Sequence, residues 1–213
     1  MMKTCYIACA LDCKIDFIPH KGDLVIGADR GYFTLVENGY SPNVAIGDFD
    51  SYTGDIVCEK TLVFPVKKDD TDSALAIKYA FDFGYKEIVV FGAIGGALDH
   101  TIANIALAAQ YAEKGTQVSF VDGENVLFAI HNASVRFDEG ASGRISVFSY
   151  GDISTGVFEK GLLYTLENAQ LTSLVPLGVS NEFVGTSSEI SVDNGTLLIY
   201  TSRKNFEKHL TRE

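Results

Sequence analysis

The chain has 213 residues, of which 46% are hydrophobic and 21% charged, and this suits a folded protein of one large domain or two small ones. Lys and Arg number 17 against 28 Asp and Glu, so the formal net charge is −11. Such a surface repels phosphate backbones and is compatible with a cationic small substrate, so we expect no nucleic-acid partner.

Up to about residue 120 the apolar pattern alternates between strands and helices, which is typical of an α/β domain built on a largely parallel sheet. The expected strands cover residues 4–10, 23–27, 62–66, 87–91 and 117–120. Helices are expected at residues 32–38, 71–83 and 99–114. The last helix is the clearest, because its apolar residues follow the helical repeat and Gly115 stands at the C-cap. Those apolar residues are Ile102, Ile105, Ala106 and Ala109.

From about residue 124 the helical periodicity disappears, and short apolar runs alternate with turn residues. Strands are expected at residues 144–148, 189–192 and 196–201. Turns are expected at Asn132, Gly140, Gly151, Gly161 and Asn194-Gly195. This half should be an antiparallel β domain. The boundary has no long Pro, Ser or Gly linker, and residues 123–125 predict a turn.

Asp48 and Asp50 flank Phe49 in the segment GDFDS. In an extended backbone residues i and i+2 face the same side, so the two carboxylates would converge while Phe49 turns toward the core. Carboxylates that close together repel each other unless a cation lies between them. A polar turn with Asp50 or Ser51 as a local cap is the alternative, because DxD alone is a weak motif.

Asp70, Thr71 and Asp72 open the helix expected at residues 71–83. The structural alternative is helix capping, in which an acidic side chain satisfies the first backbone N–H groups. We assign capping to Asp70 and keep Asp72 as the candidate ligand, because only one cap is needed. Lys67 and Lys68, just before, could meet phosphate, although lysines at a strand end are more often solvated.

A glycine-rich turn, GAIGGA at residues 92–97, lies between an apolar strand and the helix that begins near Asp99. Such a turn offers backbone N–H groups and a helix N-terminus to an anion at the carboxyl edge of the sheet. It matches neither GxGxxG nor GxxxxGK[ST], so a Rossmann cofactor site and a P-loop are both disfavoured. As an alternative, Asp99 is only the N-cap and His100 a surface residue.

Three acidic segments follow predicted strands: Asp29 follows residues 23–27, Asp70 to Asp72 follow residues 62–66, and Asp99 follows residues 87–91. The topology would gather them on one edge of the sheet. Independent helix caps would have no reason to converge. Acidic clusters beside glycine turns can hold Mg²⁺ together with a polyphosphate, because ion and ligand are both bound through oxygen. The residues therefore indicate phosphoryl or pyrophosphoryl transfer.

No apolar run approaches the roughly 20 residues that cross a bilayer, and the first residues, MMKTCYI, lack the pattern of a signal peptide. We therefore expect no membrane partner and a cytoplasmic location. Cys5, Cys9 and Cys13 recur every four residues through an apolar run, which favours small core residues over a metal site. Reduced thiols fit the cytoplasm.

Six segments follow one another along the chain: GADRG at 27–31, PNVAIGDFDS at 42–51, DDTDSALAI at 69–77, GAIGGALDHTIANI at 92–105, LENAQL at 166–171 and LGVSNEF at 177–183. Taken in this order, they resemble those of the thiamine pyrophosphokinases, which convert thiamine and ATP to thiamine diphosphate and AMP. Single pieces such as GDFDS are unspecific. An ordered series over nearly the whole chain is specific.

The resemblance implies an α/β catalytic domain at residues 1–125 and an antiparallel β-sandwich, thiamine-binding domain at residues 126–213. It implies a homodimer with thiamine at the subunit interface, Mg²⁺ as cofactor and ATP as co-substrate. Carboxylates expected to bind the metal and act in catalysis are Asp48, Asp50, Asp72 and Asp99. Residues expected to bind the nucleotide are Asp29, Arg30, Gly31, Lys68, Thr71, Gly95, Gly96 and His100. Thiamine would lie near Ser180 and Asn181, for which a β-turn is the alternative reading.

Two departures from the family pattern stand out. Where the family commonly has arginine in GGRxDH, this chain has Ala97, so a positive charge near the phosphates is missing or comes from Arg30, Lys67 or Lys68. The chain also has no Trp, which some members stack on thiamine, so a Tyr or Phe of the second half would replace it.

Three other functions stay open at this point. A pyrophosphokinase for another hydroxymethyl compound, such as a pterin, would use the same metal and phosphate residues. A non-catalytic thiamine or nucleotide sensor would bind its ligand without releasing AMP. A purely structural α/β protein would leave the ordered series of motifs unexplained.

Overall fold

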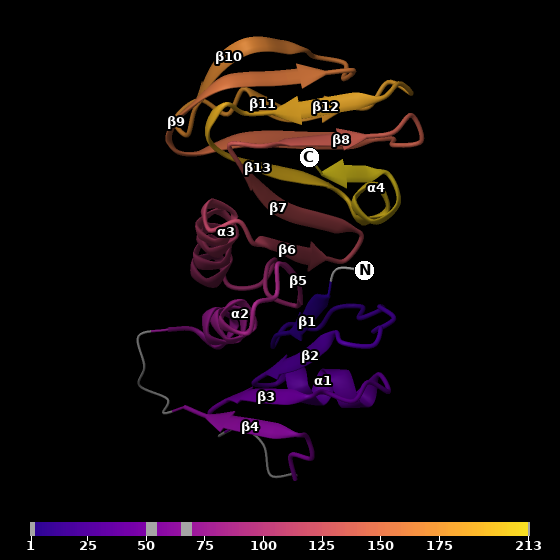
Figure 1. Ribbon diagram of the computed structural model, residues 1–213, viewed down its shortest axis with the longest axis vertical. Helices are drawn as coiled ribbons and strands as arrows, with labels where there is room; N and C mark the ends of the chain where they lie inside the picture. Colours follow the sequence, from indigo (N-terminus) through magenta and orange to yellow (C-terminus); the bar gives the residue numbers. More distant parts are fainter. Residues whose placement is uncertain (1–2, 50–54, 65–69, 213) are drawn as a thin grey trace. The chain divides into compact units, whose positions relative to one another are not determined.

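The computed structural model describes residues 3–49, 55–64 and 70–212, which form two compact units (Figure 1). The first unit contains residues up to 107 and residues 118–123, and the second contains residues 108–117 and those from 124 onward. Asp50 and Lys68 lie outside the described residues.

The first part of the chain alternates strands and helices. In order, the elements are β1 (Thr4–Ala8), β2 (Leu24–Ala28), α1 (Gly31–Glu37), β3 (Val44–Gly47), β4 (Lys60–Val63), α2 (Asp72–Asp82), β5 (Glu87–Phe91), α3 (Leu98–Glu113) and β6 (Gln117–Asp122). Their sheet has the order β6-β5-β1-β2-β3-β4. β1 pairs in parallel with both β2 and β5, and β2, β3 and β4 are also parallel neighbours. The α/β class predicted from the sequence is confirmed.

The direction in which the chain adds strands reverses at β1. The strands β2, β3 and β4 extend the sheet on one side of β1, and β5 and β6 extend it on the other. In an open α/β sheet, a reversal of this kind leaves a crevice at the carboxyl ends of the strands beside it. The carboxyl ends of β1, β2 and β5 are therefore where a ligand cavity is expected.

The sequence predicted most of these elements to within two residues at each end, and it missed β3. The residues of β3 are four apolar ones between Asn43 and Asp48, too short a run to read as a strand on its own. In the sheet all of them are buried, because β3 pairs with β2 and β4 on its two sides. The strand expected at residues 62–66 is β4, which begins earlier, at Lys60.

Phe17 anchors the long connection between β1 and β2. Its ring stacks on Tyr6 with centroids 4.1 Å apart and on Tyr40 at 4.4 Å. The Phe17 N–H donates to the Tyr40 hydroxyl at 3.0 Å, and that hydroxyl donates to the Phe17 carbonyl at 3.1 Å.

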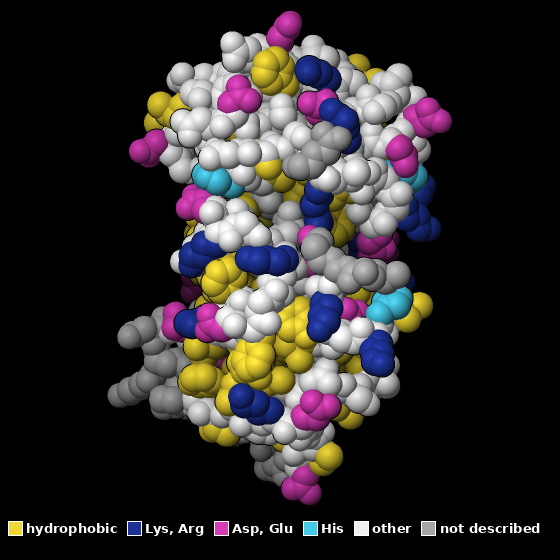
Figure 2. All heavy atoms as spheres, in the orientation of Figure 1, with side chains coloured by type: hydrophobic (Ala, Val, Ile, Leu, Met, Phe, Trp, Pro, Cys, Tyr) yellow, Lys and Arg dark blue, Asp and Glu magenta, His cyan; other side chains and the backbone are white. Residues whose placement is uncertain are grey.

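On the face shown in Figure 2, hydrophobic side chains gather over the unit that contains β1 to β4, with charged side chains dispersed around them.

The helix α3 is confirmed, but its predicted apolar face is buried only in part. Ala109 is 2% exposed, whereas Ile102 is 57% exposed, and the most buried residues also include Asn104 and Ala108, at 3% and 0%. A helical repeat fits either face, and the small or hydrogen-bonding residues are buried because Asn104 binds the backbone after β5. Gly115 has the expected left-handed backbone, with φ of 67°, and its N–H donates to the Ala112 carbonyl.

The second unit is built from antiparallel strands. They are β7 (Asn125–His131), β8 (Ser134–Phe137), β9 (Arg144–Lys160), β10 (Leu166–Thr172), β11 (Gly178–Glu182), β12 (Ser188–Ser191), β13 (Asn194–Ser202) and β14 (Leu210–Arg212), with the helix α4 (Arg203–Lys208) before the last. One sheet has the order β7-β13-β9-β11, and the other has β10-β9-β12-β8-β14. The expected antiparallel sandwich is confirmed.

The long strand β9 belongs to both sheets of the sandwich. Residues 145–150 pair with β13, and residues 153–160 pair with β10 and β12. Gly151, predicted as a turn between strands, lies inside β9 with φ of 93°, where the strand passes from one sheet to the other. Asn194-Gly195 opens β13 instead of forming a separate turn, and α4 was not predicted.

No helix in the described part of the chain is both long and apolar enough to cross a membrane.

The backbone beyond β1 lies against the backbone beyond β5, and Gly92 permits this approach. The Leu11 N–H donates to the Gly92 carbonyl at 3.0 Å. Gly92 has φ of 66°, and a Cβ atom on it would lie 2.4 Å from the Leu11 carbonyl oxygen. A side chain at this position would push the two chain segments apart.

Gly92→Ala should therefore destabilise the protein more than the same change at Gly84. Gly84 has φ of 85° but nothing within 4 Å of its would-be Cβ, so Gly84→Ala carries only the backbone cost, about 1–2 kcal/mol. The steric clash in Gly92→Ala should add roughly 1–3 kcal/mol. Urea unfolding of both variants measures the difference. Equal losses of unfolding free energy in the two variants would show that Gly92 and the Leu11 carbonyl are not in close contact.

Candidate active site

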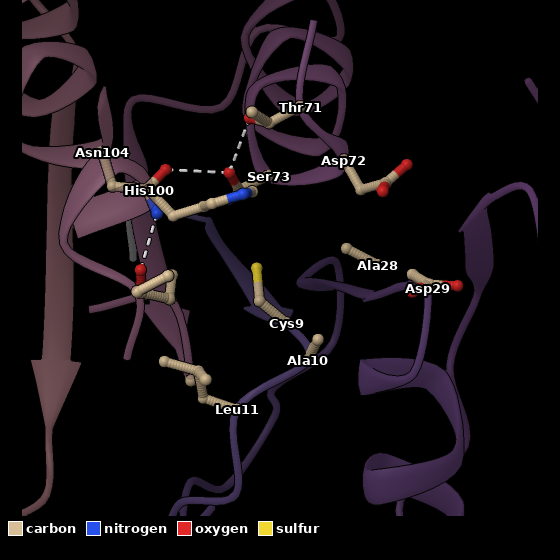
Figure 3. A pocket seen from close by; sticks show the side chains of 13 residues that line it. Cys9, Ala10, Leu11, Ala28, Asp29, Thr71, Asp72, Ser73, His100 and Asn104 are labelled. Atoms are coloured by element: carbon tan, nitrogen blue, oxygen red, sulfur yellow. Dashed lines mark hydrogen bonds between the residues drawn. The ribbon is translucent and has the colours of Figure 1, made fainter. Parts of the chain in front are cut away.

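A cavity of about 340 Å³ lies at the carboxyl ends of β1, β2 and β5, where the reversal of strand order predicts it. Its wall comes from residues 9–11 after β1, 28–29 after β2, 71–73 at the start of α2, 92–93 after β5 and residues 97, 100 and 104 before and within α3. The cavity has the size of a small-molecule site. Figure 3 shows how its side chains are arranged.

Asp29 reaches the cavity from the turn after β2. Its backbone is left-handed, with φ of 49°, and its N–H donates to the Ile46 carbonyl at 2.7 Å. A Cβ on Gly47 would lie 3.0 Å from the Asp29 Cα, so the residue before Asp48 is in close contact with this turn. The structure thus brings the GADRG turn and the start of the GDFDS segment together.

Asp72 and Thr71 line the cavity from the start of α2, and Thr71 is the helix cap. The Thr71 hydroxyl accepts from the Ala74 N–H at 3.2 Å. The cap assigned to Asp70 is therefore wrong, because Thr71 provides it with a shorter side chain one residue later. Asp72 does not serve as the cap, and its carboxylate lies on the same side of the cavity as that of Asp29 in Figure 3.

A polar network that the sequence did not reveal forms another part of the wall. The Ser73 hydroxyl contacts Thr71 Oγ1 at 3.0 Å and donates to Asn104 Oδ1 at 2.8 Å. Asn104 Nδ2 donates to the Ala93 carbonyl at 2.6 Å (Figure 3). Ser73 and Asn104 are 8% and 3% exposed. The one signal in the sequence was an Asn, a poor helix former, inside a long helix.

The glycine turn only partly faces this cavity. His100 and Ala97 line it, whereas Gly95 and Gly96 line a neighbouring cavity of about 180 Å³ that also includes Asp122. The Gly95 N–H donates to Thr101 Oγ1 at 3.3 Å, so it is already used within the turn. Asp99 lies in the first turn of α3, is exposed, and accepts from the His100 N–H at 2.9 Å.

Three more expected site residues, Arg30, Gly31 and Asp48, do not line the cavity. Arg30 is exposed and pairs with Asp12 at 3.3 Å. Gly31 begins α1 so close to β1 that a Cβ on it would lie 2.0 Å from the Ala8 carbonyl oxygen. The extended conformation expected at Phe49, next to Asp48, is wrong, because Phe49 is left-handed with φ of 54°. Asp50, Lys67 and Lys68 fall outside the described residues.

Cys9 lies in the cavity wall as an unreactive thiol. Burial, with smaller contributions from the nearby Asp72 carboxylate and Cys13, raises its pKa to about 12. A thiol with this pKa stays protonated near neutral pH. Cys5 is also buried, so these two cysteines are the small core residues that were expected, and none of the described cysteines forms a disulfide.

The donor set of the cavity suits Mg²⁺ in combination with a phosphate ligand. Among residues 3–49, 55–64 and 70–212, no three Asp, Glu, His or Cys side chains are arranged to hold a metal ion by themselves. Mg²⁺ prefers oxygen ligands and is usually held by one or two carboxylates plus substrate phosphates and water. Asp29 and Asp72 provide two carboxylates in one cavity.

In the second unit, the expected thiamine residues lie on β11. Ser180 is exposed and left-handed, with φ of 60°, and its N–H donates to Ser146 Oγ at 3.0 Å. Asn181 is 3% exposed and its side chain binds the backbone of Tyr164. The Tyr164 side chain itself is 67% exposed and is the most exposed aromatic among the described residues of this unit.

The fold and the cavity define an α/β protein with carboxylates at its topological switch point, followed by an antiparallel sandwich. Family models agree for both parts: "Thiamin pyrophosphokinase, catalytic domain" matches residues 18–120, and "Thiamin pyrophosphokinase, vitamin B1 binding domain" matches residues 132–197. The chain therefore belongs to the thiamin pyrophosphokinase family.

Individual relatives agree with the family models. A thiamine pyrophosphokinase of Bacillus subtilis is 28% identical over 84% of this chain and 87% of its own length. The crystal structure of a Bacillus subtilis thiamine pyrophosphokinase superposes with a TM-score of 0.81 at 25% identity, covering 94% of this chain and 99% of that one. A thiamin pyrophosphokinase family protein of Enterococcus faecalis shares the fold, with a TM-score of 0.80 at 24% identity and the same coverage.

Asn104→Asp should lower the free energy of unfolding while the side chain keeps its size and shape. The change replaces the amide that donates to the Ala93 carbonyl by an acceptor, so two oxygens would face each other in a buried place. The expected loss is about 1–3 kcal/mol of unfolding free energy. Gln110→Glu, the same chemical change on an exposed residue of α3, is the matched control and should have little effect. Equal urea midpoints for the two variants would contradict a structural role for the network.

Proposed function

We propose that this protein transfers the pyrophosphoryl group of ATP to the hydroxyl group of thiamine. The hydroxyl oxygen attacks the β-phosphorus, the bond from that phosphorus to the oxygen bridging the α-phosphate breaks, and AMP leaves. The products are thiamine diphosphate and AMP. Family membership over both parts of the chain supports this reaction.

The observation that carries the proposal is the placement of Asp29 and Asp72 in one cavity. They come from segments 43 positions apart in the sequence (72 − 29) and meet at the switch point of the sheet. Phosphoryl transfer depends mainly on positioning and charge neutralisation, and a carboxylate-lined cavity at this place can provide both.

We assign the metal site to the expected set of Asp48, Asp50, Asp72 and Asp99, with Asp29 beside them. When bound, Mg²⁺ neutralises phosphate charge. Asp72 is the preferred proton acceptor for the thiamine hydroxyl, because it lines the cavity whereas Asp99 does not. Thr71 and His100 line the same cavity and are assigned to the nucleotide. The other residues assigned to the nucleotide are Arg30, Gly31, Lys68, Gly95 and Gly96.

On the thiamine side, the proposal uses Ser180, Asn181 and Tyr164. Because the chain lacks Trp, another aromatic ring must contact the flat rings of thiamine. Tyr164 is exposed and its backbone is held by Asn181, which supports this assignment. We also propose a homodimer with thiamine at the subunit interface, which light scattering of the purified protein would test.

The catalytic domain is assigned to residues 1–125 and the thiamine-binding domain to residues 126–213. The family models support this division, since one ends at residue 120 and the other begins at residue 132. We place the reaction in the cytoplasm, where four free cysteines would stay reduced. A pterin pyrophosphokinase or a non-catalytic sensor is not favoured, because both family models are those of thiamin pyrophosphokinase.

Purified protein incubated with ATP, Mg²⁺ and thiamine should form AMP and thiamine diphosphate in equal amounts. Chromatography of the nucleotides and of the thiamine phosphates in the same samples measures both products. EDTA should stop their formation, because the phosphates would lose their counter-ion. Thiamine binding without AMP would contradict the proposal in favour of a sensor, and AMP formation only with another hydroxymethyl compound would change the substrate.

Asp72→Asn should lower kcat/KM by about a hundredfold or more, because it removes a charge from the cavity while leaving the helix cap on Thr71. Asp82→Asn, at the exposed end of the same helix, is the control for a charge change on α2. Thermal unfolding should be nearly the same for both variants. An Asp72→Asn enzyme with the wild-type rate would rule out the assigned role of this carboxylate.

A further inference from the structure

Glu159 is a buried acid that the proposed chemistry does not use. It lies near the end of β9, two residues after the buried Val157, and the two-residue repeat of a strand places both on the same face. Glu159 is 1% exposed. Its Oε2 accepts from Asn181 Nδ2 at 2.8 Å, and its buried Oε1 has no hydrogen-bond partner among the described residues.

Asn181 links Glu159 to two other segments. Its Nδ2 also donates to the Tyr164 carbonyl at 2.6 Å, and its Oδ1 accepts from the N–H groups of Tyr164 and Glu182, both at 2.9 Å. A side-chain amide has two N–H donors and one oxygen with two lone pairs. All four positions of Asn181 are therefore used within the chain, and a ligand could bind this amide only by displacing one of these bonds.

Glu159 also lies close to β11 on the other side of Ser180. A Cβ on Gly178 would lie 3.2 Å from Glu159 Oε1 and 2.3 Å from the Val147 carbonyl oxygen, so there is no room for a side chain between β11 and this carboxyl group. Glu159 thus binds the strand at residue 181 and lies close to it at residue 178, on either side of the left-handed Ser180. A change in the volume or charge of Glu159 would move Ser180 and Tyr164 together.

We propose that Glu159 is a positioning residue for thiamine: in its neutral form it holds Asn181, and through Asn181 it sets the positions of Tyr164 and Ser180. This inference rests on the proposed function. It makes Asn181 an internal support of the thiamine-binding edge, and it leaves Ser180 and the exposed ring of Tyr164 as the groups that face the substrate.

The neutral form is favoured by burial, which raises the pKa of Glu159 to about 7, while the bond from Asn181 lowers it less. Besides Glu159, the charged side chains on β9 to β12 are Arg144, Asp152 and Lys160 on β9, Glu167 on β10, Glu182 on β11 and Glu189 on β12. These six are exposed or partly exposed, and none of them contributes to the shift. Ionisation above the pKa would place an unpaired charge under β11 and loosen it.

The test compares the KM for thiamine of the wild type and of Glu159→Gln at pH 6 and pH 8. Gln is the neutral isostere, and it keeps an acceptor for Asn181. With a pKa of about 7, the neutral fraction falls roughly tenfold between the two pH values, so the wild-type KM should rise about tenfold. Glu159→Gln should match the wild type at pH 6 and keep a low KM at pH 8. Titration of the substrates affects both proteins equally, so it cancels in the ratio of their KM values.

One further measurement and one control variant separate positioning from other roles. Thermal unfolding of the ligand-free proteins should show the wild type losing stability from pH 5 to pH 8, since a raised pKa gives stability that is present at low pH and lost as the pH rises through it. Glu159→Gln should lack this loss. Glu139→Gln, an exposed acid of the same unit, should behave like the wild type in both assays.

Each outcome decides the inference. A higher KM for Glu159→Gln at pH 8 would mean that an ionised Glu159 attracts the thiamine cation, which overturns positioning by the neutral form. Equal pH profiles for both proteins would also overturn it. An equal fall in kcat at both pH values with KM unchanged would indicate only a structural role. If the wild type forms no thiamine diphosphate even at pH 6, the proposed function fails and this role fails with it.

Discussion

The close approach of neighbouring backbone to the end of β1 is the constraint on which the candidate site depends. A Cβ on Gly31 would lie 2.0 Å from the Ala8 carbonyl oxygen, and one on Gly92 would lie 2.4 Å from that of Leu11. The chain can therefore turn into α1 on one side of β1 and toward α3 on the other only because both residues are glycine. Gly31 keeps the turn that carries Asp29 close to β1, and Gly92 brings the chain after β5 toward α3, whose residues His100 and Asn104 line the cavity.

The polar network of Thr71, Ser73 and Asn104 then fixes that wall. It joins the start of α2, the middle of α3 and the backbone after β5, which are far apart in the sequence. Buried networks of this kind are stabilising only when each member is satisfied, and each of these side chains has a partner at 3.0 Å or less. The cavity is thus held by directional bonds as well as by apolar packing, and Asp72 is positioned by a helix whose start cannot shift freely.

Secondary structure that depends mainly on local sequence was predicted correctly. Elements and site residues that depend on contacts with distant parts of the chain were missed. β5 was predicted to the residue, because its apolar run is bounded by polar residues and glycine. The short β3 is a strand only because β2 and β4 pair with it. In the site, Asp29 and Asp72 were predicted together from topology, whereas Asn104 and Glu159 were missed. Their partners lie 11 and 22 residues away, and no local pattern reveals a bond of that kind.

The charges of the cavity also explain how an acidic protein could act on a polyphosphate. Of the described residues that line the cavity, none is Lys or Arg. Two carboxylates in this place repel free ATP, whose charge is strongly negative, and the net charge of −11 adds to that repulsion. A nucleotide that arrives with its divalent cation is attracted instead, because the carboxylates bind the cation as ligands. The same negative field favours the approach of the thiamine cation. The absence of basic side chains from the described wall is therefore compatible with the proposed reaction, provided that the cation accompanies the nucleotide.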